Sequence, residues 1–353
     1  MIYAHPKCVL EKSAVMRYNQ IGGEIMRTLM IGKNDAGQRL DKFLQKRFKT
    51  MPKSMLYMYI RKKCIKINGK KCDIADKLRE GDELTFFIKD EFFDAPQEKH
   101  YDFLKAPSKL DIVYEDGNLL LLNKKPGVIV HQDKSYHFDS LVARVQHYLY
   151  EKGEYDPEAD KAFAPALVNR IDRNTGGIVI AAKNAESLRI LNQKMKTREM
   201  EKFYLCLLCG RPKKNEATLT AYMTKNESQN KVRVFAKPVD GSKKMITHYR
   251  VLGSVGKYTL AEVELLTGRT HQIRAHLAYM GTPLAGDTKY GGQKAAGDLP
   301  YQALYSYKLR FAFSTDAGAL QYLDGREFEV DTSKIWFLQR DAAPNPAFGS
   351  VFI

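Results

Sequence analysis

The apolar residues of this chain recur at two different spacings, and the change between them divides the sequence into regions. Between residues 38 and 48, four large apolar residues recur at helical spacing, which predicts an amphipathic helix with one buried face. Pro52 opens a second such segment, because proline is favoured in the first turn of a helix. Alternating residues at 65–70, which end in an Asn-Gly turn, and at 81–88 predict two strands.

Downstream of residue 110 the pattern favours strands over helices. The run from Ile178 to Ala182 is short and wholly apolar and follows two glycines, which is typical of a buried strand. Asn184 can cap the helix that follows. Further strands are predicted on both sides of an Asp-Gly turn within 112–123 and at 203–209, 245–253 and 258–266, with a helix near 270–280. These hairpin-like spacings predict an α+β domain with a mostly antiparallel, mixed sheet.

These segments predict four parts along the chain. Residues 1–30 show no recognisable periodicity and are interpreted as an N-terminal extension whose first two dozen residues are disordered. Residues 31–90 form the small helix–helix–strand–turn–strand module. A linker of mixed polarity with two prolines follows at 91–109, and residues 110–353 form the second, larger domain.

The charge of the chain predicts a polyanionic partner. Its 57 Lys and Arg exceed its 41 Asp and Glu, which gives a net charge of +16 and a pI near 9.4. Residues 33–90 contain 16 basic and 8 acidic side chains, so they hold +8 of that total. Nucleic acid is the default partner of such a surface. The alternative is that these charges only keep an ordinary surface solvated.

Several classes of protein are not expected from this composition. The apolar runs are far shorter than a membrane span, and residues 1–30 lack the continuous apolar core of a signal peptide. We therefore expect a cytoplasmic protein that does not enter the membrane. An odd number of cysteines, five, favours reduced thiols. Cys206 and Cys209 lie in a predicted strand without a matching second pair, so we expect buried thiols rather than a zinc site.

One loop carries the best candidate for chemistry. Asp172 lies between Arg170 and Arg173, just before the apolar run that begins at Ile178. Loops at the mouth of a strand often carry catalytic groups because a rigid element holds them, and two nearby arginines favour the ionised carboxylate. Gly176 and Gly177 would leave the backbone open to a bulky planar ligand. The local sequence alone, however, favours a structural Arg–Asp pair at a turn.

Four ordered blocks of the chain resemble the motifs of the RluA-type pseudouridine synthases. The central block, Asn169-Arg-Ile-Asp-Arg-Asn-Thr-Gly-Gly177, is similar to the family's His-Arg-Leu-Asp-x-x-Thr-Ser/Gly-Gly. The other blocks are Asn123-Lys-Lys-Pro-Gly-Val-Ile-Val-His131, Lys202-Phe-Tyr-Leu205, and Gly268-Arg-Thr-His-Gln-Ile-Arg-Ala-His276 with Gly286-Asp287 and Tyr290-Gly291. Two positions depart from the family, because Asn169 replaces a His and Leu304-Tyr305-Ser306 stands where Leu-His-Ala is common.

The N-terminal module resembles the small αL-type RNA-binding module of a small-subunit ribosomal protein. Arg39-Leu-Asp-Lys-Phe-Leu44 and Gly81-Asp82 are typical of it, and this module often precedes synthases of this family. The resemblance implies that RNA is bound by basic residues on both domains. The candidates are Arg39, Lys42, Arg61, Lys62 and Lys63 in the module, and Arg170, Arg269 and His271 in the larger domain.

The resemblance also implies the catalytic residues and the fold of the larger domain. Asp172 is carried over as the reacting carboxylate, Tyr204 as a residue that stacks on the target base and handles a proton, and Arg274 as the partner of Asp172. The family fold implies a bent, eight-stranded mixed sheet with the active site in its cleft. No cofactor and no metal are expected, since the sequence contains no Walker motif, no His-Glu-x-x-His and no dinucleotide fingerprint.

We therefore expect an enzyme that converts specific uridines of structured RNA into pseudouridine, with large-subunit ribosomal RNA as its substrate, and that acts as a monomer. A transfer-RNA uridine synthase is the alternative with the same chemistry. A non-catalytic RNA-binding or ribosome-assembly protein on this scaffold is the alternative without it. A metal-dependent nuclease would need further clustered carboxylates, which the motifs lack.

Overall fold

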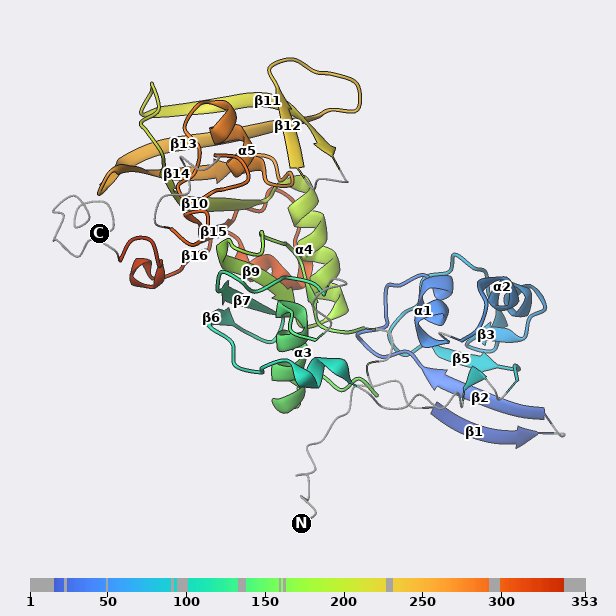
Figure 1. Ribbon diagram of the computed structural model, residues 1–353. Helices are drawn as coiled ribbons and strands as arrows, with labels where there is room; N and C mark the ends of the chain where they lie inside the picture. Colours follow the sequence, from blue (N-terminus) through green and yellow to red (C-terminus); the bar gives the residue numbers. More distant parts are fainter. Residues whose placement is uncertain are drawn as a thin grey trace, which may run out of the picture.

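The structure is a computed structural model, and it describes residues 16–21, 24–48, 50–89, 92–93, 101–132, 138–158, 160, 163–226, 231–291 and 299–339. Within these residues the chain forms a small module and a larger domain, each with its own sheet and its own buried core. The module stands beside the larger domain, near helix α4 (Ala185–Thr197) (Figure 1).

The module packs two helices on a sheet that has five strands in the described residues, in the order β1-β2-β5-β3-β4. The apolar stripe predicted between residues 38 and 48 is buried, with Leu40, Phe43, Leu44 and Phe48 all in the core. The elements are β1 (Met16–Ile21), β2 (Glu24–Met30), α1 (Leu40–Arg47), α2 (Lys53–Arg61), β3 (Ile65–Ile67), β4 (Lys70–Lys71) and β5 (Glu83–Phe86). The predicted order of elements is confirmed.

The predicted start of the module at residue 31 is wrong. Strand β2 pairs antiparallel with β5 along Arg27–Met30, and Leu29 is fully buried in the module core. These residues therefore belong to the module and not to an extension. Strand β2 pairs on one edge with β1, just upstream, and on the other edge with β5, more than fifty residues downstream. Gly22-Gly23, which stands between β1 and β2 in the sequence, is a hairpin signal that hydrophobic periodicity alone does not show. The predicted disorder of the first residues falls on positions 1–15, which lie outside the described residues.

The larger domain is built on a mixed sheet with eleven strands in the described residues. The order is β12-β11-β13-β14-β10-β15-β9-β7-β6, with β16 on β15 and β8 on β9. Among the pairings between described strands, that of β15 with β9 is parallel and the others are antiparallel. The strands are β6 (Ile112–Glu115), β7 (Leu119–Lys124), β8 (Ala166–Leu167), β9 (Gly176–Ala182), β10 (Met200–Leu208), β11 (Glu216–Asn226), β12 (Lys231–Phe235), β13 (Lys243–Val255), β14 (Tyr258–Leu265), β15 (Leu304–Phe311) and β16 (Glu327–Glu329). The mixed, mostly antiparallel sheet agrees with the prediction, but the number of strands exceeds the eight that the family fold implies.

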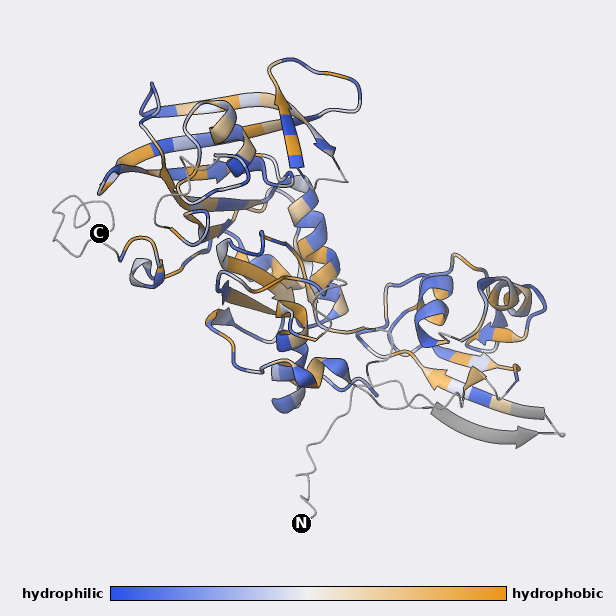
Figure 2. Ribbon diagram, viewed as in Figure 1, coloured by the Kyte–Doolittle hydropathy of each residue, from blue (hydrophilic) through white to orange (hydrophobic). Residues whose placement is uncertain are grey.

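Helices cover both faces of this sheet, which explains why β7 and β9 are buried along their whole length and are mostly apolar (Figure 2). Alternate residues of the two strands face opposite sides. One set packs on α3 (Leu141–Glu151), and the other packs in the cluster that contains Leu191 of α4. As predicted, Asn184 caps α4, because its side chain accepts a hydrogen bond from the backbone N–H of Ser187 at 2.8 Å. The remaining helices are α5 (Gln272–Tyr279) and the 3₁₀ turns η2 (Asp102–Lys105), η3 (Gly318–Leu323) and η4 (Thr332–Lys334).

The predicted linker at 91–109 is too long at its C-terminal end. The 3₁₀ turn η2 places Phe103 in the same cluster as α3, where Ala106 is also buried. The larger domain therefore begins by residue 101. Mixed polarity concealed this segment, because a single buried turn has no hydrophobic period.

Hydrogen bonds between described residues join the module to the larger domain. The Arg189 guanidinium on α4 donates to the Ala36 carbonyl at 2.9 Å, and Asn34 donates to the Asp160 carboxylate at 3.2 Å. No helix in the described part of the chain has the length and the apolar character that a bilayer crossing requires.

Candidate active site

Asp172 lies in a loop that leads into β9, as the sequence predicts, and the loop is fixed at both ends. At the upstream end, the Asn169 side chain accepts a hydrogen bond from the Ile180 N–H at 2.8 Å and donates to the Ile178 carbonyl. At the downstream end, the Thr175 N–H donates to the Asp172 carbonyl at 3.0 Å. The residue that replaces the family's His is therefore an anchor for the loop on the strand that follows it.

The expected role of the two glycines is wrong. A Cβ atom at Gly176 would lie 2.4 Å from the Tyr305 ring, and one at Gly177 would lie 2.1 Å from the Ser306 carbonyl oxygen. Gly177 also has a φ of +111°, which side chains rarely tolerate. Both glycines are needed because β15 packs directly on β9, so they leave no open backbone for a planar ligand. The ring that requires glycine at position 176 is that of Tyr305, which lies in the Leu304-Tyr305-Ser306 segment that differs from the family motif.

One arginine joins two carboxylates at the centre of the site. Arg274 on α5 donates through Nη1 to Asp172 Oδ2 at 2.8 Å. Its Nε and Nη2 atoms donate to the two carboxylate oxygens of Asp287 at 2.8 and 2.9 Å. Burial opposes the charge of Arg274, but the hydrogen bonds and the charges of Asp287 and Asp172 outweigh it and raise the pKa of the guanidinium. The predicted pairing of Arg274 with Asp172 is present, and the bidentate anchor fixes its direction.

The Asp172 side chain is 27% exposed, whereas that of Asp287 is fully buried. Asp172 is thus the carboxylate that a substrate can reach, whereas Asp287 holds the Arg274 guanidinium in place. Asp287 belongs to one of the family motifs, but the sequence alone suggested no role for it. The predicted neighbours Arg170 and Arg173 are exposed, and the Arg173 Nε atom donates to the Gly127 carbonyl at 3.1 Å.

His271 lies closer to Asp172 than the sequence suggested. It precedes α5 in a left-handed conformation, and its side chain is only 9% exposed. Its Nδ1 atom lies 2.8 Å from the Tyr290 hydroxyl, and its Nε2 atom lies 3.9 Å from Asp172 Oδ1. Burial lowers the pKa of His271, although Asp172 opposes this shift. The imidazole is therefore neutral at neutral pH. Contact of His271 with phosphate stays a prediction.

Tyr204 lies where β10 and β15 change register. Phe203 pairs with Lys308, whereas Tyr204 pairs with Ser306, so β15 bulges by one residue between them. Bulges near active sites commonly redirect a side chain. Tyr204 is 6% exposed and its hydroxyl is hydrogen-bonded to Ser306. Burial raises the pKa of Tyr204 to about 12, with the Ser306 hydrogen bond opposing and Asp172 adding to the shift. The phenol is protonated at neutral pH, and little of the ring is open for stacking on a base.

Comparison with known proteins agrees with this arrangement. Residues 118–279 match the family model described as RNA pseudouridylate synthase, and residues 38–84 match the S4 domain. A protein of Vibrio cholerae named ribosomal large subunit pseudouridine synthase C is 34% identical over 276 residues, which cover 75% of this chain and 80% of that protein. The chain belongs to the RNA pseudouridylate synthase family.

Two further relatives of this synthase show the same coverage of the chain. A Salmonella typhi protein with the same name, ribosomal large subunit pseudouridine synthase C, is 32% identical and spans 76% of this chain and 81% of its own length. An uncharacterized RNA pseudouridine synthase of Bacillus subtilis is 30% identical and spans 78% of this chain and 86% of its own length. Each of these relatives is therefore matched over about three quarters of this chain and over at least four fifths of its own length.

The predicted RNA-binding residues of the synthase occupy two separate surfaces. Arg170 and Arg269 are exposed beside the site, and the Arg269 Nε atom donates to the Lys244 carbonyl at 3.3 Å. The module's candidates are exposed on α1, on α2 and at the end of α2; they are Arg39, Lys42, Arg61, Lys62 and Lys63. The structure brings the catalytic candidates together, and it leaves the module residues as a distant basic surface.

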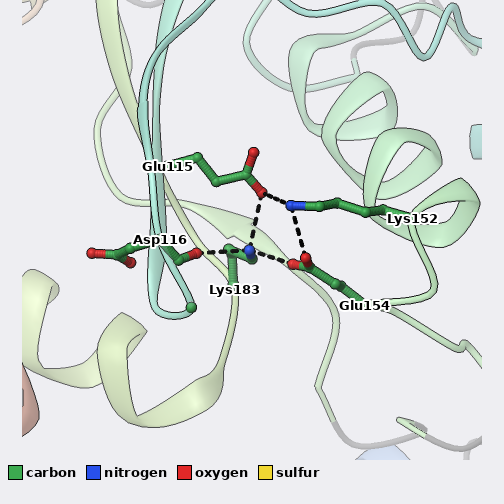
Figure 3. A pocket seen from close by; sticks show the side chains of 6 residues that line it. Glu115, Asp116, Lys152, Glu154 and Lys183 are labelled. Carbon is green, nitrogen blue, oxygen red and sulfur yellow. Dashed lines mark hydrogen bonds and ion pairs between the residues drawn. The ribbon is translucent and has the colours of Figure 1, made fainter.

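A cavity of about 570 Å³ is lined by charged residues that include Glu115, Lys152 and Lys183 (Figure 3). Lys183 directly follows β9, so the cavity lies at the other end of that strand from Asp172. Its charges are paired with one another: Lys152 contacts Glu115 at 2.6 Å and Glu154 at 2.8 Å, and Lys183 contacts the same two carboxylates. Because β9 spans seven residues, roughly 20 Å at 3.3 Å per residue separates this cavity from the catalytic loop. We interpret the cluster as a support for the strand ends.

No group of three or more His, Cys, Asp or Glu side chains in the described residues is placed to hold a metal ion. Cys206 is fully buried on β10, and Cys209 follows the end of that strand. This position fits the predicted buried thiol for Cys206, whereas Cys209 is only partly buried.

Proposed function

We propose that this synthase converts uridine into pseudouridine in structured RNA, that its targets lie in large-subunit ribosomal RNA, and that Asp172 is the reacting carboxylate. The observation that carries the proposal is the bidentate Asp287–Arg274 pair, which aims the remaining guanidinium nitrogen at Asp172. Membership of the family supports the reaction. The names of the Vibrio and Salmonella relatives support the ribosomal target.

The reaction breaks the bond between N1 of uracil and C1′ of ribose and forms a bond between C5 and C1′. The base loses its C5 proton to solvent and gains a proton at N1, so the reaction needs neither an oxidant nor a group donor. A carboxylate next to the sugar can stabilise or capture C1′ while the base turns. Asp172 suits this role because it is partly exposed and Arg274 fixes its direction.

The residues around Asp172 suggest separate roles in the proton transfers. Tyr204 is a protonated phenol at neutral pH, since its pKa is raised to about 12, so we assign it hydrogen-bond donation to the detached base rather than stacking. His271, which is neutral because burial lowers its pKa, can accept the proton that leaves C5. Arg170 is exposed beside Asp172, where it can fill the stack that a flipped-out uridine leaves.

The S4 module supplies affinity in this proposal. Its exposed cations would contact phosphate oxygens, and the catalytic domain would read the position of the target base. We propose module boundaries near residues 16 and 93 and a catalytic domain that starts near residue 101. We also propose that the protein is active as a monomer, since every group assigned to the site comes from one chain.

A tritium-release assay tests this function. Large-subunit ribosomal RNA transcripts and transfer RNA transcripts labelled with tritium at C5 of uridine would be incubated with the protein in the presence of EDTA. Pseudouridine formation releases the tritium, so release from the ribosomal transcripts is expected. Release from the transfer RNA transcripts alone would show that the substrate is transfer RNA and not ribosomal RNA. Binding without release would contradict catalysis, and strict dependence on added metal would favour a nuclease.

The Asp172→Asn variant tests the residue. It should reduce single-turnover release by about 10⁴-fold or more, as loss of an essential catalytic group commonly does, and RNA affinity should stay nearly unchanged. Asp102→Asn, which removes an exposed carboxylate elsewhere in the same domain, is the matched control. Appreciable turnover by the Asp172→Asn variant would overturn the assignment.

A further inference from the structure

The groups of the site come from two parts of the large sheet that meet between β15 and β9. The larger half-sheet, β12-β11-β13-β14-β10-β15, carries Tyr204 on β10, and helix α5, which holds Arg274, packs in the same core cluster as Tyr204. The smaller half-sheet, β9-β7-β6, receives the loop of Asp172. The bond between Arg274 and Asp172 therefore depends on how the two half-sheets are joined.

The ladder that joins the half-sheets is short. In the described residues β15 and β9 pair in parallel at two positions, Tyr305 with Gly176 and Ser306 with Gly177. The neighbouring pairings are longer, since β7 pairs with β9 at six positions and β10 with β15 at seven. Parallel pairs are also slightly less stable per residue than antiparallel pairs. Side chains that cross this junction should therefore contribute to its geometry.

Tyr305 crosses the junction completely. Its ring lies on Gly176, where a Cβ atom would be 2.4 Å away. Its hydroxyl donates to the Asn123 side-chain carbonyl of β7 at 2.6 Å, and the Asn123 amide donates in turn to the Asp111 carboxylate at 2.9 Å. Burial raises the pKa of Tyr305 to about 12, although the Asn123 hydrogen bond opposes this shift, so the hydroxyl is protonated at neutral pH. One side chain of the larger half-sheet thus spans β9 and bonds the strand beyond it.

This contact is a feature of the present chain and not of the family motif. The family commonly has a histidine where Tyr305 stands, and a ring nitrogen of histidine reaches less far from the backbone than a tyrosine hydroxyl. The motif also allows serine at the position of Gly176, whereas the Tyr305 ring leaves room for glycine alone. Tyr305 and Gly176 are therefore matched to each other, and their match brings the hydroxyl to Asn123.

We propose that Tyr305 is a positioning residue for catalysis, which fixes how the two half-sheets sit against each other and thereby keeps Asp172 in line with Arg274. The inference rests on the proposed function of Asp172. It predicts that the Tyr305 hydroxyl affects the rate of the chemical step and not the binding of RNA, because the side chain is buried. It also predicts that this effect acts through Arg274.

The Tyr305→Phe variant tests the proposal, because it removes the hydroxyl and keeps the ring on Gly176. At saturating RNA the single-turnover rate of tritium release should fall by about tenfold, less than the roughly 10²-fold that a 1 Å misplacement of a catalytic group can cause. The dissociation constant for RNA should stay within about twofold, since RNA is held by surface contacts. Both measurements would be made well below the melting temperatures of both proteins.

Tyr307→Phe is the matched control. Tyr307 lies on the same strand, is equally buried, and donates its hydroxyl hydrogen bond to Glu262 of β14, inside the larger half-sheet. This variant should lose stability but keep the wild-type rate at saturating RNA. An equal loss of rate in both variants would mean that general destabilisation explains the effect, and this would overturn the proposal. A Tyr305→Phe variant as fast as wild type would overturn it too.

A double-mutant cycle with Arg274→Lys shows whether Tyr305 acts through the site. Substitutions that act on one contact are not additive, so Tyr305→Phe should slow the Arg274→Lys protein little or not at all. A merely structural tyrosine would cause the same tenfold loss in both backgrounds, and that result would contradict the proposal. An inactive wild-type protein would instead refute the proposed function, so the two failures are distinguishable.

If Tyr305→Phe does not fold, Asn123→Ala decides the question. This variant keeps the tyrosine and removes the acceptor of its hydroxyl on the other side of the junction. We expect a single-turnover rate reduced by about tenfold with unchanged RNA affinity. A folded Asn123→Ala variant with the wild-type rate would show that the bond across the junction does not position Asp172.

Discussion

In the S4 module the candidate RNA-binding cations lie on the surface, whereas in the catalytic domain the arginine that is bonded to Asp172 is buried. Lys42, Lys62 and Lys63 are exposed and make no ion pair within the described part of the chain. Arg274 is buried, and it makes three hydrogen bonds to groups whose positions are fixed. The same kind of charge is therefore used in two different environments.

This difference predicts how each region tolerates substitution. Exposed cations attract phosphate at long range, so each one contributes a small and nearly independent amount that salt screens. A buried cation depends on geometry, because its donors must meet particular acceptors and its removal leaves buried acceptors or charges unpaired. Changes in the module should alter affinity gradually, and changes at the site should alter the rate abruptly.

Replacing Arg274 by lysine should have the largest effect of the substitutions that keep the charge. A lysine cannot form the planar fork that binds Asp287 through two nitrogens while a third reaches Asp172. We expect the single-turnover rate to fall by about 10²-fold with little change in RNA affinity. Exchanging Arg61 in the module for lysine is the matched control. A wild-type rate for Arg274→Lys would show that charge alone suffices at the site.

A fall in pH should act on the two regions in opposite directions. Burial lowers the pKa of His276 to about 4, so the unfolded state binds a proton at this residue more readily than the folded state does. The folded catalytic domain therefore loses stability as the pH falls from about 6.5 towards 4. Burial, with Asp160 adding to it, raises the pKa of Asp35 to about 6. The folded module therefore gains stability as the pH falls through that value.

Urea unfolding monitored by fluorescence measures this effect in the catalytic domain. Trp336 is the sole tryptophan of the chain and lies in that domain. Between about pH 7 and about pH 5 we expect a loss of up to about 2 kcal/mol. The His276→Gln variant should remove most of this dependence. Protection factors for module amides should rise over the same range, and Asp35→Asn should abolish that rise. A parallel response of both regions would contradict the assignment.

Removing charge from the module should have the smallest effect on catalysis. We expect the Lys62→Gln, Lys63→Gln double variant to bind RNA more weakly, with a log–log salt slope shallower by roughly 0.7 to 0.9 for each phosphate that the module no longer neutralises. The rate at saturating RNA should not change. Lys257→Gln, an exposed lysine of the β13–β14 turn, is the control. A reduced saturated rate would show that the module contributes to the site itself.

Local pattern was sufficient to predict the helices of the module and most strands of the catalytic domain. Their apolar residues repeat with a clear period, and a cap or a turn residue marks their ends, as Asn184 does. Strands β1 and β2 were not predicted, because hydrophobic periodicity alone does not show the Gly22-Gly23 hairpin signal between them and because β2 pairs with β5 across more than fifty residues. The motifs led to Asp172, Tyr204 and Arg274, and the structure brings Arg274 onto Asp172.

What the sequence could not predict depends on contacts between distant segments. The glycines at 176 and 177 suggested open backbone, but β15 fills that space. Asp287 belongs to one of the family motifs, yet its contact with Arg274 is made by hydrogen bonds that span 13 residues. The sequence also did not show that the Tyr204 ring is packed inside the domain. Side-chain chemistry suggested the participants, and tertiary packing determines which of them can reach a substrate.

The division of labour between the two regions is tested most directly by comparing the full chain with a chain that begins at Tyr101, where η2 still completes the catalytic core. RNA affinity across a salt series and the single-turnover rate at saturation would be measured for both. We predict a weaker affinity and a shallower salt slope for the shorter chain, because residues 33–90 hold +8 of the net charge, and an unchanged saturated rate. An unchanged slope, or a folded but inactive shorter chain, would contradict the account.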